Sequence, residues 1–396
     1  MRPSLLQRAF GPNIEWANWG CLPLLASIAL SALGVYAIDV GSTDTGTALA
    51  HRAMVQLVYL AVGVLAACTV CVPRIHLVRL LSWPILACTV GLLVFLLLPF
   101  IPASIVRPRN GCRGWIDLGP ADLQPAELAK VAYVLAMAEY LRFRSDHRTW
   151  VGLTPVAVIT MIPVALITLQ PDLGTALLFI PTAFAILLAA GAKLKHLAIV
   201  VLAGTLAAPA MYPFLKPHQK QRIVGLIKQV QGDTAHRSDA DVFQASTAIM
   251  LVGSGQAQGY NDAMARTIVR FSRLPERHND MIFAVVAARF GLTGGLMVLA
   301  LYGLWALGAL LAAAASRDAF GRLVCVGSTA MIATQAVVNM GMNVGVMPIV
   351  GLPLPFVSAG GSSMVSVWLM TGLVFSVGMR PPPRMARPTF EFGAHE

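Results

Sequence analysis

Long apolar runs recur along the chain from residue 17 to about residue 379, separated by short polar connections. A membrane-spanning helix needs about 20 mostly apolar residues. About ten runs meet this need, near 17–38, 52–72, 77–101, 124–142, 150–169, 174–192, 196–215, 281–313, 321–345 and 361–379. The pattern therefore predicts an all-α integral membrane protein with about ten transmembrane helices.

Composition leads to the same fold class. The chain has 396 residues, of which 57% are hydrophobic and only 12% are charged, and its mean hydropathy is +0.71. A soluble domain could not bury that much apolar surface. No Ser/Gly-rich linker separates the runs, so we expect a single polytopic membrane domain over 1–396. The first run lacks the cleavage pattern of a signal peptide, and we expect it to stay in the membrane.

Lysine and arginine are unevenly distributed between the two sides of the predicted bundle. Most basic residues of the short connections fall on one side, which predicts that both termini are cytoplasmic. The same alternation leaves one long segment, about 216–280, on the outer side between helices 7 and 8. This segment and the outer loop around Arg113 carry many cations, which implies an anionic partner at the outer surface. No nucleic-acid-binding motif is present.

The cysteines indicate neither a disulfide framework nor a metal site. Five of the six lie within predicted helices, and only Cys112 falls in an outer loop. Cys68 and Cys71 have the spacing of a redox or metal pair. Without a second pair or a nearby histidine, that spacing favours ordinary packing, and we assign no metal ligand.

Ionisable residues within or at the edges of the predicted helices are the first candidates for function, because burying charge in a membrane is costly. Glu127 and Lys130 are three residues apart and lie on one helix face. They could form a structural ion pair or belong to a site. Asp172 stands at the start of the sixth helix and Asp280 at the start of the eighth. Residue types alone favour helix caps at both positions, with a carboxylate base as the alternative for Asp280.

Four stretches in a fixed order resemble the signatures of one family. They are "GWIDLGPADLQPAELAK", "LQPDLGTALL", "LPERHNDMIFAVVAARFG" and "NMGMNVGVMPIVGLPLPFVSAGGSS". The chain is similar, over about 17–379, to the SEDS proteins (shape, elongation, division and sporulation), which include RodA and FtsW. The resemblance implies a ten-helix peptidoglycan glycosyltransferase that polymerises lipid II, the undecaprenyl-pyrophosphate-linked disaccharide pentapeptide. It places the protein in the bacterial cytoplasmic membrane, with its reaction at the outer face.

The resemblance also assigns roles to residues. The acid of the family's "PE.HTDFIF" motif is regarded as catalytic, and Asp280 of "PERHNDMIF" occupies that place. Glu127, Lys130 and Asp172 match further family positions, as substrate-binding or site-organising residues. The lipid pyrophosphate that leaves in the reaction needs cationic groups, for which the candidates are Arg113, Lys130, Arg222, Arg273 and Arg277. The remaining expected site residues are Gln244, His278, Asn339, Asn343, Ser358 and Ser362.

The stretch from Gly351 to Ser363 has its own physical interpretation. Its prolines rule out a regular helix, and we expect "GGSS" to form a flexible turn before the last helix. Non-helical backbone at membrane depth persists where it is buried in protein or lines a wet cavity. The stretch is therefore expected to line an outer cleft, with an ordinary structured loop as the alternative.

The resemblance implies no bound cofactor, although a divalent cation at the pyrophosphate is the alternative to basic side chains. The implied partner is a class B penicillin-binding protein. Two other functions compete with polymerisation: a lipid II flippase and a non-catalytic scaffold for a transpeptidase. The short N-terminus and Arg277 favour the elongation branch, typified by RodA, over the division branch.

Several positions depart from the family pattern. Where the family has "AEEFG", this chain has Ala288 and Arg289 in place of the two acids. Val350 replaces a threonine, Ala359 a tyrosine and Phe243 another tyrosine. Because Asp280 is retained, we expect an active protein with an altered site.

Overall fold

The computed structural model describes residues 18–42, 49–73, 75–102, 104–106, 112–119, 121–144, 146–211, 220 and 240–380. Within these ranges the fold is almost entirely helical, and the only sheet is a two-stranded hairpin, β1 (Ile116–Asp117) and β2 (Asp122–Leu123). All ten predicted runs form helices. They are α2 (Cys21–Gly41), α3 (His51–Cys71), α4 (Ile75–Leu97), α5 (Pro125–Leu141), α6 (Trp150–Leu169), α7 (Leu173–Ala189), α8 (Leu194–Met211), α12 (Ile282–Ala315), α13 (Ala319–Asn343) and α14 (Gly361–Gly378).

Seven of these helices are long and apolar enough to cross a membrane, namely α2, α3, α4, α6, α12, α13 and α14. Helix α7 and the Leu194–Leu206 part of α8 are shorter apolar helices. Helix α5 carries Glu127 and Lys130 and is buried along most of its length. Protein neighbours rather than lipid surround α5, which allows it to carry charge. The all-α, multi-pass membrane fold is thus confirmed.

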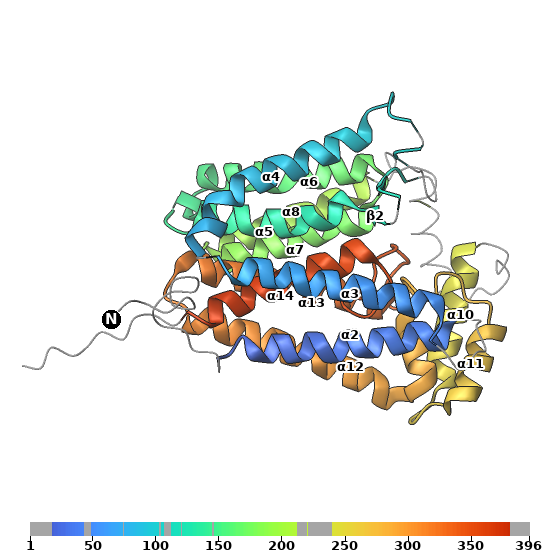
Figure 1. Cartoon of the computed structure of the whole chain (residues 1–396). Helices are drawn as coiled ribbons and strands as arrows, with labels where there is room; N and C mark the ends of the chain where they lie inside the picture. The colour runs from blue at the N-terminus through green and yellow to red at the C-terminus, as the bar shows by residue number, and fades with distance from the viewer. Residues whose placement is uncertain are drawn as a thin grey trace, which may run out of the picture.

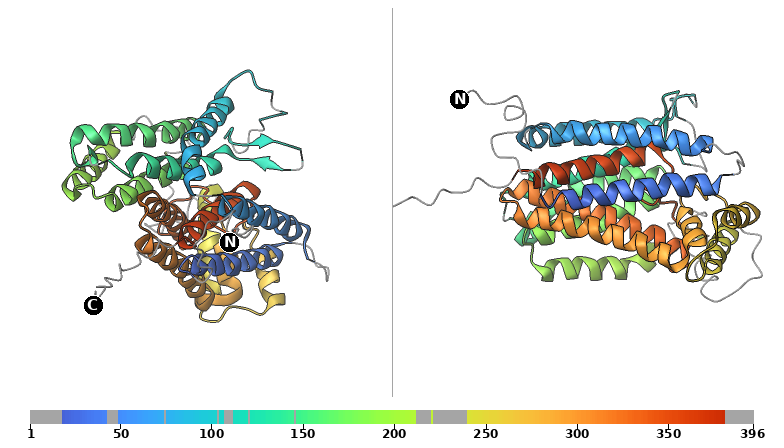
Figure 2. Two further views of the ribbon diagram at one scale, coloured as in Figure 1. Left: turned by 60° about the vertical axis from the view of Figure 1, so that its left-hand side comes forward. Right: turned by 60° about the horizontal axis from the view of Figure 1, so that its bottom comes forward.

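The helices lie nearly parallel in two groups (Figures 1 and 2). One group holds α4 to α8, and the other holds α2, α3 and α12 to α14. Contacts of α13 with α5 and α7, and of α14 with α5, join the two groups. Helix α14 packs most extensively against α3, and α12 against α2 and α13. Segments from both halves of the sequence therefore meet along α13 and α14.

The long segment between the seventh and eighth spans contains two helices that the sequence did not predict. These are α10 (Ala240–Ser254) and α11 (Asp262–Phe271), which pack on α12 and α2 at one end of the bundle (Figure 1). Helix α12 is broken at Gly291, whose φ is 64° and ψ is −155°. The turn between α10 and α11 docks at this break, since Leu292 N donates to Gln256 O at 2.8 Å. A β-carbon on Gly291 would lie 2.5 Å from Gly259 N, so only glycine fits.

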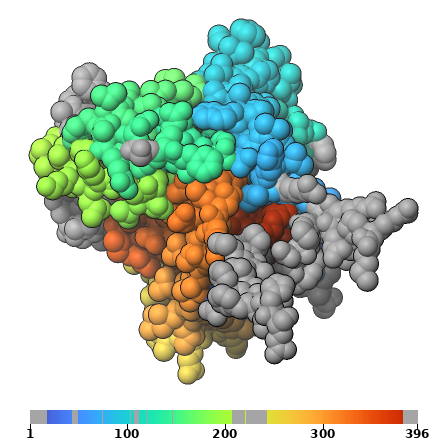
Figure 3. Space-filling view, turned by 90° about the vertical axis from the view of Figure 1, so that its left-hand side faces the viewer, coloured from blue at the N-terminus to red at the C-terminus, as the bar shows by residue number. Residues whose placement is uncertain are grey.

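The family-like stretches gather at one end of the bundle, which we call the motif end. It comprises residues 272–281, the segment 351–360 and the first turns of α5, α7 and α14. The opposite end carries the α5–α6 and α12–α13 connections, seen face-on in Figure 3. Basic residues predicted to be cytoplasmic lie there; for example, Arg142 pairs with Glu139 at 3.2 Å.

Candidate active site

The backbone that carries Asp280 is held in place by side chains from another helix. Asn339 Nδ2 and Asn343 Nδ2 of α13 donate to the carbonyl oxygen of Asp280, at 2.8 and 3.0 Å. Both asparagines are fully buried. The Nδ2 of Asn339 also donates to Leu352 O at 2.6 Å, so it joins the motif to the segment 351–360. The amides of both residues are thus engaged with the backbone, and their role in organising a site stays a prediction.

The segment 351–360 contributes further bonds to the same stretch. Ser358 Oγ donates to Asn279 O at 2.6 Å, and Ala359 N donates to His278 O at 2.8 Å. Three consecutive carbonyls, from residue 278 to residue 280, thus have fixed partners. The half-buried Asp280 carboxylate faces exposed Gly351: a β-carbon there would lie 3.5 Å from Asp280 Oδ2. This arrangement gives the acid a defined position at the motif end.

Asp280 does not cap α12. The N-cap position belongs to Met281, whose side chain makes no capping bond. Asn343 Oδ1 of α13 accepts from Ala284 N in the first turn of α12, at 3.2 Å. The cap interpretation suggested by residue types is therefore wrong for Asp280, because Met281 stands between it and the first helical residue, Ile282. For Asp172 the cap interpretation is confirmed: its Oδ1 accepts from Thr175 N at 3.0 Å. Desolvation raises the pKa of Asp172, with the Thr175 hydrogen bonds opposing the shift.

Glu127 and Lys130 form a fully buried ion pair. Lys130 Nζ lies 2.8 Å from Glu127 Oε2, and each side chain is 1% exposed. Ser366 Oγ of α14 donates to Glu127 Oε2 at 2.6 Å. Lys130 Nζ also donates to Gln335 Oε1 of α13 at 2.8 Å. The charges and most of their hydrogen-bonding capacity are thereby satisfied within the protein.

A continuous chain of hydrogen bonds leads from this pair to the motif. Gln335 Nε2 donates to Pro353 O at 2.8 Å. Pro353 follows Leu352, whose carbonyl is bound by Asn339, and Asn339 also holds the Asp280 carbonyl. Gln335 and Asn339 are four residues apart on one face of α13. The pair is thus connected to Asp280 through α13 and the segment 351–360.

Ser362 has a structural role at the same end. Its Oγ accepts from Gln124 N at 2.9 Å and donates to Asp122 O at 3.0 Å, joining α14 to the start of α5. Residues 361–363 already belong to the first turn of α14. The expected flexible "GGSS" turn is therefore wrong, because the glycines and serines begin the helix.

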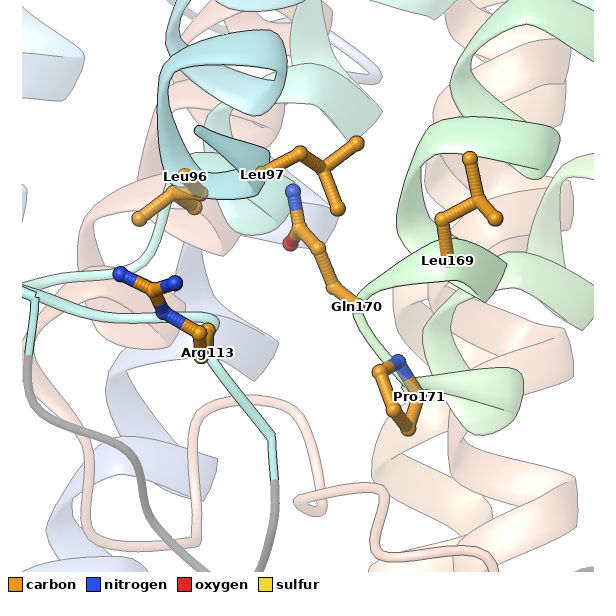
Figure 4. Close-up of a pocket in the computed structure, with 6 residues that line it drawn as sticks. All are labelled: Leu96, Leu97, Arg113, Leu169, Gln170 and Pro171. Atoms are coloured by element: carbon orange, nitrogen blue, oxygen red, sulfur yellow. The ribbon is translucent and has the colours of Figure 1, made fainter. Parts of the chain in front are cut away.

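Arg113 lies beside a small pocket between the ends of α4 and α6 (Figure 4). The pocket has a volume of about 290 Å³ and is lined by Leu96, Leu97, Arg113, Leu169, Gln170 and Pro171. Arg113 Nη2 donates to Ile101 O at 3.2 Å, and its buried Nε has no partner. No direct contact links Arg113 to residues 272–281 within the described ranges. The structure does not bring this candidate to Asp280.

Other expected site residues fall elsewhere. Gln244 is half-buried on α10, and its side chain makes no hydrogen bond to the described part of the chain. Arg222 lies outside the described residues, and Arg273 is exposed. The described residues contain no group of three His, Cys, Asp or Glu side chains that could hold a metal ion.

His278 is a buried, neutral histidine two residues before Asp280. It is 6% exposed, and its Nδ1 has no hydrogen-bond partner. Desolvation, together with the nearby Arg52 and Arg277 charges, lowers its pKa to about 4. The ring packs against Gly41, where a β-carbon would lie 3.1 Å from Nδ1.

This burial predicts a pH-dependent stability. Because the folded-state pKa lies below the ordinary value of 6.5, the unfolded chain binds a proton first as the pH falls. We expect the free energy of unfolding to fall between pH 6.5 and about 4, and His278→Gln to remove that part of the dependence. Thermal unfolding of both proteins across this range tests it. An identical pH profile in the variant would contradict this assignment.

Arg289, which stands where the family has an acid, belongs to a network of charged side chains. Arg289 Nε donates to Tyr36 OH at 2.7 Å and lies 3.7 Å from Asp262 Oδ1. Arg266 of α11 pairs with Asp262 at 2.8 Å and with Asp39 at 2.5 Å. Two arginines and two aspartates thus join α11 to α2 and α12. The Arg266 hydrogen bond is the main cause that lowers the pKa of Asp262.

Restoring the family's acid at this position is therefore expected to be harmful. Arg289→Glu would place a carboxylate beside Asp262, replacing attraction by repulsion and removing the bond to Tyr36. We expect a loss of about 1–3 kcal/mol in unfolding free energy, of which Asp262→Asn in the same chain recovers part. Thermal unfolding of the two variants and wild type measures this. A fully stable Arg289→Glu protein would show that the network does not hold α11.

Three contributing residues were not singled out from the sequence. Gln335 and Gln56 are uncharged polar residues inside apolar runs, and their burial at 1% each shows that they are bonded internally. A search for isolated amides in the predicted spans would have found both. Arg52 is the third, and its charge contributes to lowering the pKa of His278 and of Arg277.

Comparisons with known proteins show which family this chain matches. The family described as cell cycle protein, defined by FtsW, RodA and SpoVE, matches residues 18–381. A probable peptidoglycan glycosyltransferase FtsW of Nitrosococcus halophilus is 34% identical over 340 residues, 84% of this chain and 84% of the relative. The peptidoglycan glycosyltransferase MrdB of Escherichia coli K12 is 32% identical over 269 residues, 68% of this chain and 71% of the relative.

A solved structure is also similar along nearly the whole chain. It is described as "Structural coordination of polymerization and crosslinking by a peptidoglycan synthase complex". Its matching chain has a TM-score of 0.74 and 29% identity, covering 92% of this chain and 97% of that chain. Together, these matches and the order of the motifs place this chain in the cell cycle protein family of FtsW, RodA and SpoVE.

Proposed function

We propose that this protein is a peptidoglycan glycosyltransferase that polymerises lipid II. The observation that carries the proposal is the fixed position of Asp280, whose peptide is held by Asn339 and Asn343. The names of the relatives from Nitrosococcus halophilus and Escherichia coli support the same reaction class. The anionic, lipid-linked substrate also suits a membrane domain with cations at its motif end.

In this proposal Asp280 is the general base. The sugar hydroxyl of the acceptor attacks the anomeric carbon of the donor, and a new C–O bond forms as the bond to the pyrophosphate breaks. The hydroxyl proton passes to the Asp280 carboxylate, and the electron pair of the broken bond leaves with the lipid pyrophosphate. A positioned base contributes on the order of 10²–10⁴-fold to such a step.

The proposed location is the bacterial cytoplasmic membrane, with the motif end outward and both termini in the cytoplasm. The excess of arginine at the opposite end supports this orientation. Arginines 142, 144 and 148 all lie near the α5–α6 connection at that end. Lipid II would then be polymerised on the side where the cell wall is built.

The flippase alternative is less well supported by the arrangement of charge. A flippase needs a polar path across the whole bilayer, whereas the polar contacts of Glu127, Lys130 and Asp280 lie toward the motif end. Arg289, a charged residue of α12, is engaged with Tyr36 and Asp262. The scaffold alternative predicts a folded protein without activity in the presence of every partner.

We further propose that the protein acts with a class B penicillin-binding protein during cell elongation. The similar chain from a peptidoglycan synthase complex supports a partnership between polymerisation and crosslinking. Arg277 in the motif supports the elongation branch. Depletion in the native bacterium should then give rounded cells, whereas filaments would assign the protein to division.

The test of this function is reconstitution of the purified full chain with lipid II, alone and with the transpeptidase. Glycan strands sensitive to a muramidase are expected, and the partner should increase their yield. Full activity alone, together with no co-purification in mild detergent, would count against the partner. Absence of strands under every condition would favour the scaffold.

A further inference from the structure

A second pocket lies at the end of the bundle opposite the motif end, which faces the viewer in Figure 3. It has a volume of about 260 Å³ and is formed by α4, the last turn of α5 and the connection that follows α5. Its lining residues are Trp83, Glu139, Tyr140, Arg142, Phe143 and Arg144. Pockets that enclose whole small molecules usually measure about 300–1,000 Å³. This pocket therefore suits a ligand of which only a small polar part enters.

The lining of this pocket carries an excess of positive charge. Its acid, Glu139, has its Oε2 3.2 Å from Arg142 Nε and 3.9 Å from Arg79 Nε. Asp318, a further acid whose charge acts on Glu139, caps α13 through two backbone N–H groups. Two arginines therefore balance the Glu139 carboxylate, and Arg144 adds a third guanidinium group. Such an arrangement attracts an anion.

One guanidinium nitrogen at this pocket has no acceptor. Arg142 Nη1 is buried, and it forms no hydrogen bond with the part of the chain that the structure describes. A buried donor without an acceptor is costly, and a ligand oxygen that accepts from it removes that cost. Phosphate oxygens suit the role, because guanidinium groups donate to them in charge-assisted hydrogen bonds.

Aromatic rings restrain both arginines of the lining. The guanidinium carbon of Arg142 lies 4.4 Å from the centre of the Phe143 ring, and that of Arg144 lies 4.4 Å from the centre of the Tyr140 ring. Arg144 Nη1 also donates to Tyr140 OH at 3.4 Å. A guanidinium group stacked on a ring keeps its N–H edge available for an anion.

Topology alone accounts for arginines at this end of the bundle, because basic residues gather on the cytoplasmic side. Arg148 fits that explanation: its side chain is exposed, and its Nε donates to Gly191 O at 3.2 Å. Topology does not account for the buried Nη1 of Arg142 or for the pocket beside it. These two observations indicate a ligand site.

Apolar side chains continue from the pocket into the bilayer. Helix α4 is long and apolar enough to cross a membrane, and Trp83, Ala87 and Val94 are exposed on one of its faces. Leu80 is 65% exposed nearer the start of α4. Tryptophan and tyrosine are typical of the boundary between headgroups and hydrocarbon. Trp83 and Tyr140 therefore place the pocket at headgroup depth, with lipid chains beside α4.

We propose that this pocket binds the phosphate of an anionic glycerophospholipid whose acyl chains lie along α4. Arg142 Nη1 and the Arg144 guanidinium group donate to the phosphate oxygens. Basic pockets between transmembrane helices on the cytoplasmic side are suited to anionic headgroups. In the orientation proposed above, the pocket faces the cytoplasmic leaflet, which contains anionic lipids. The inference does not depend on the reaction proposed for Asp280.

The test is native mass spectrometry of the full chain with phosphatidylglycerol and, separately, with phosphatidylcholine of the same acyl chains. Wild type is expected to bind phosphatidylglycerol about tenfold more tightly, and Arg142→Gln should lose most of this preference. Arg144→Gln should lose it as well, and because Arg144 is exposed this variant is expected to fold normally. Arg148→Gln, which removes an exposed arginine from the same end of the bundle, is the matched control and should bind like wild type. Thermal unfolding of each preparation establishes that it is folded.

A further arm separates a lipid from a free phosphate compound. Glycerol phosphate carries the anion without acyl chains, and we expect it to displace phosphatidylglycerol only weakly. Glycerol phosphate that binds wild type as tightly as phosphatidylglycerol does would overturn the lipid proposal. Equal binding of the two lipids by wild type, or an unchanged preference in folded Arg142→Gln and Arg144→Gln proteins, would overturn it too.

Discussion

Asp280→Asn is expected to abolish glycan synthesis from lipid II while leaving the protein folded. Asparagine has nearly the same shape but cannot accept the proton of the attacking hydroxyl, so the rate should fall by on the order of 10²–10⁴-fold or more. The contacts of Asn339 and Asn343 with residue 280 use its backbone carbonyl, which the substitution preserves. Expression, thermal stability and partner binding should therefore stay close to wild type.

The measurement is strand formation by the purified variant and wild type under the same conditions. Asp262→Asn is a useful control, because it also removes one carboxylate, but from the network around Arg266 on α11. That control should retain polymerisation with reduced stability. Normal strand formation by the Asp280→Asn variant would show that Asp280 is not the general base.

Replacing both members of the Glu127 and Lys130 pair should leave a folded but inactive protein. Either single change, Glu127→Gln or Lys130→Met, leaves one buried charge without its counterion, which costs roughly 3–5 kcal/mol. The double change removes both charges and should recover most of this stability. It also removes the Lys130 bond to Gln335, and with it the chain of contacts through Pro353 toward Asp280.

Because the pair is fully buried, we expect it to act on the site by positioning. The double variant should therefore lower kcat with little change in KM, and Gln335→Met should show the same pattern more mildly. Thermal stability and polymerisation are measured on wild type, the two single variants and the double variant. A stable double variant with a near-normal rate of polymerisation would show that the ion pair serves only to pack the helices.

The spans could be predicted because the bilayer imposes a simple rule on sequence. Each crossing needs a long apolar run, so all ten runs became helices, with small shifts at their ends. Helices α10 and α11 were missed because they lie at the end of the bundle, where this rule does not apply. Helix α11 is short and buries only one face, through Ala265 and Val269.

The site was harder to predict because its contacts join distant parts of the chain. Gln56 meets Ser358 across 302 positions, and spacing within one helix cannot reveal such a pair. The ion pair of Glu127 and Lys130 was predictable because both residues lie on one helix face. The family motif made Asp280 the leading candidate for a base, since residue types alone favoured a helix cap.

The departure at Arg289 illustrates a further limit. The sequence showed the replacement of an acid by a cation but not its compensation. Asp262 lies on α11, a helix that was not predicted, and Tyr36 lies on α2. The effect of a reversed charge can be interpreted only when the side chains that contact it are known.

The most direct test of the central claim uses wild-type protein in liposomes with the motif end outward and fluorescent lipid II confined to the outer leaflet. The claim is that the motif end joins lipid II molecules through the base Asp280. It predicts muramidase-sensitive strands in the outer leaflet from wild type and none from Asp280→Asn. Rapid movement of lipid II to the inner leaflet without strand formation would contradict it.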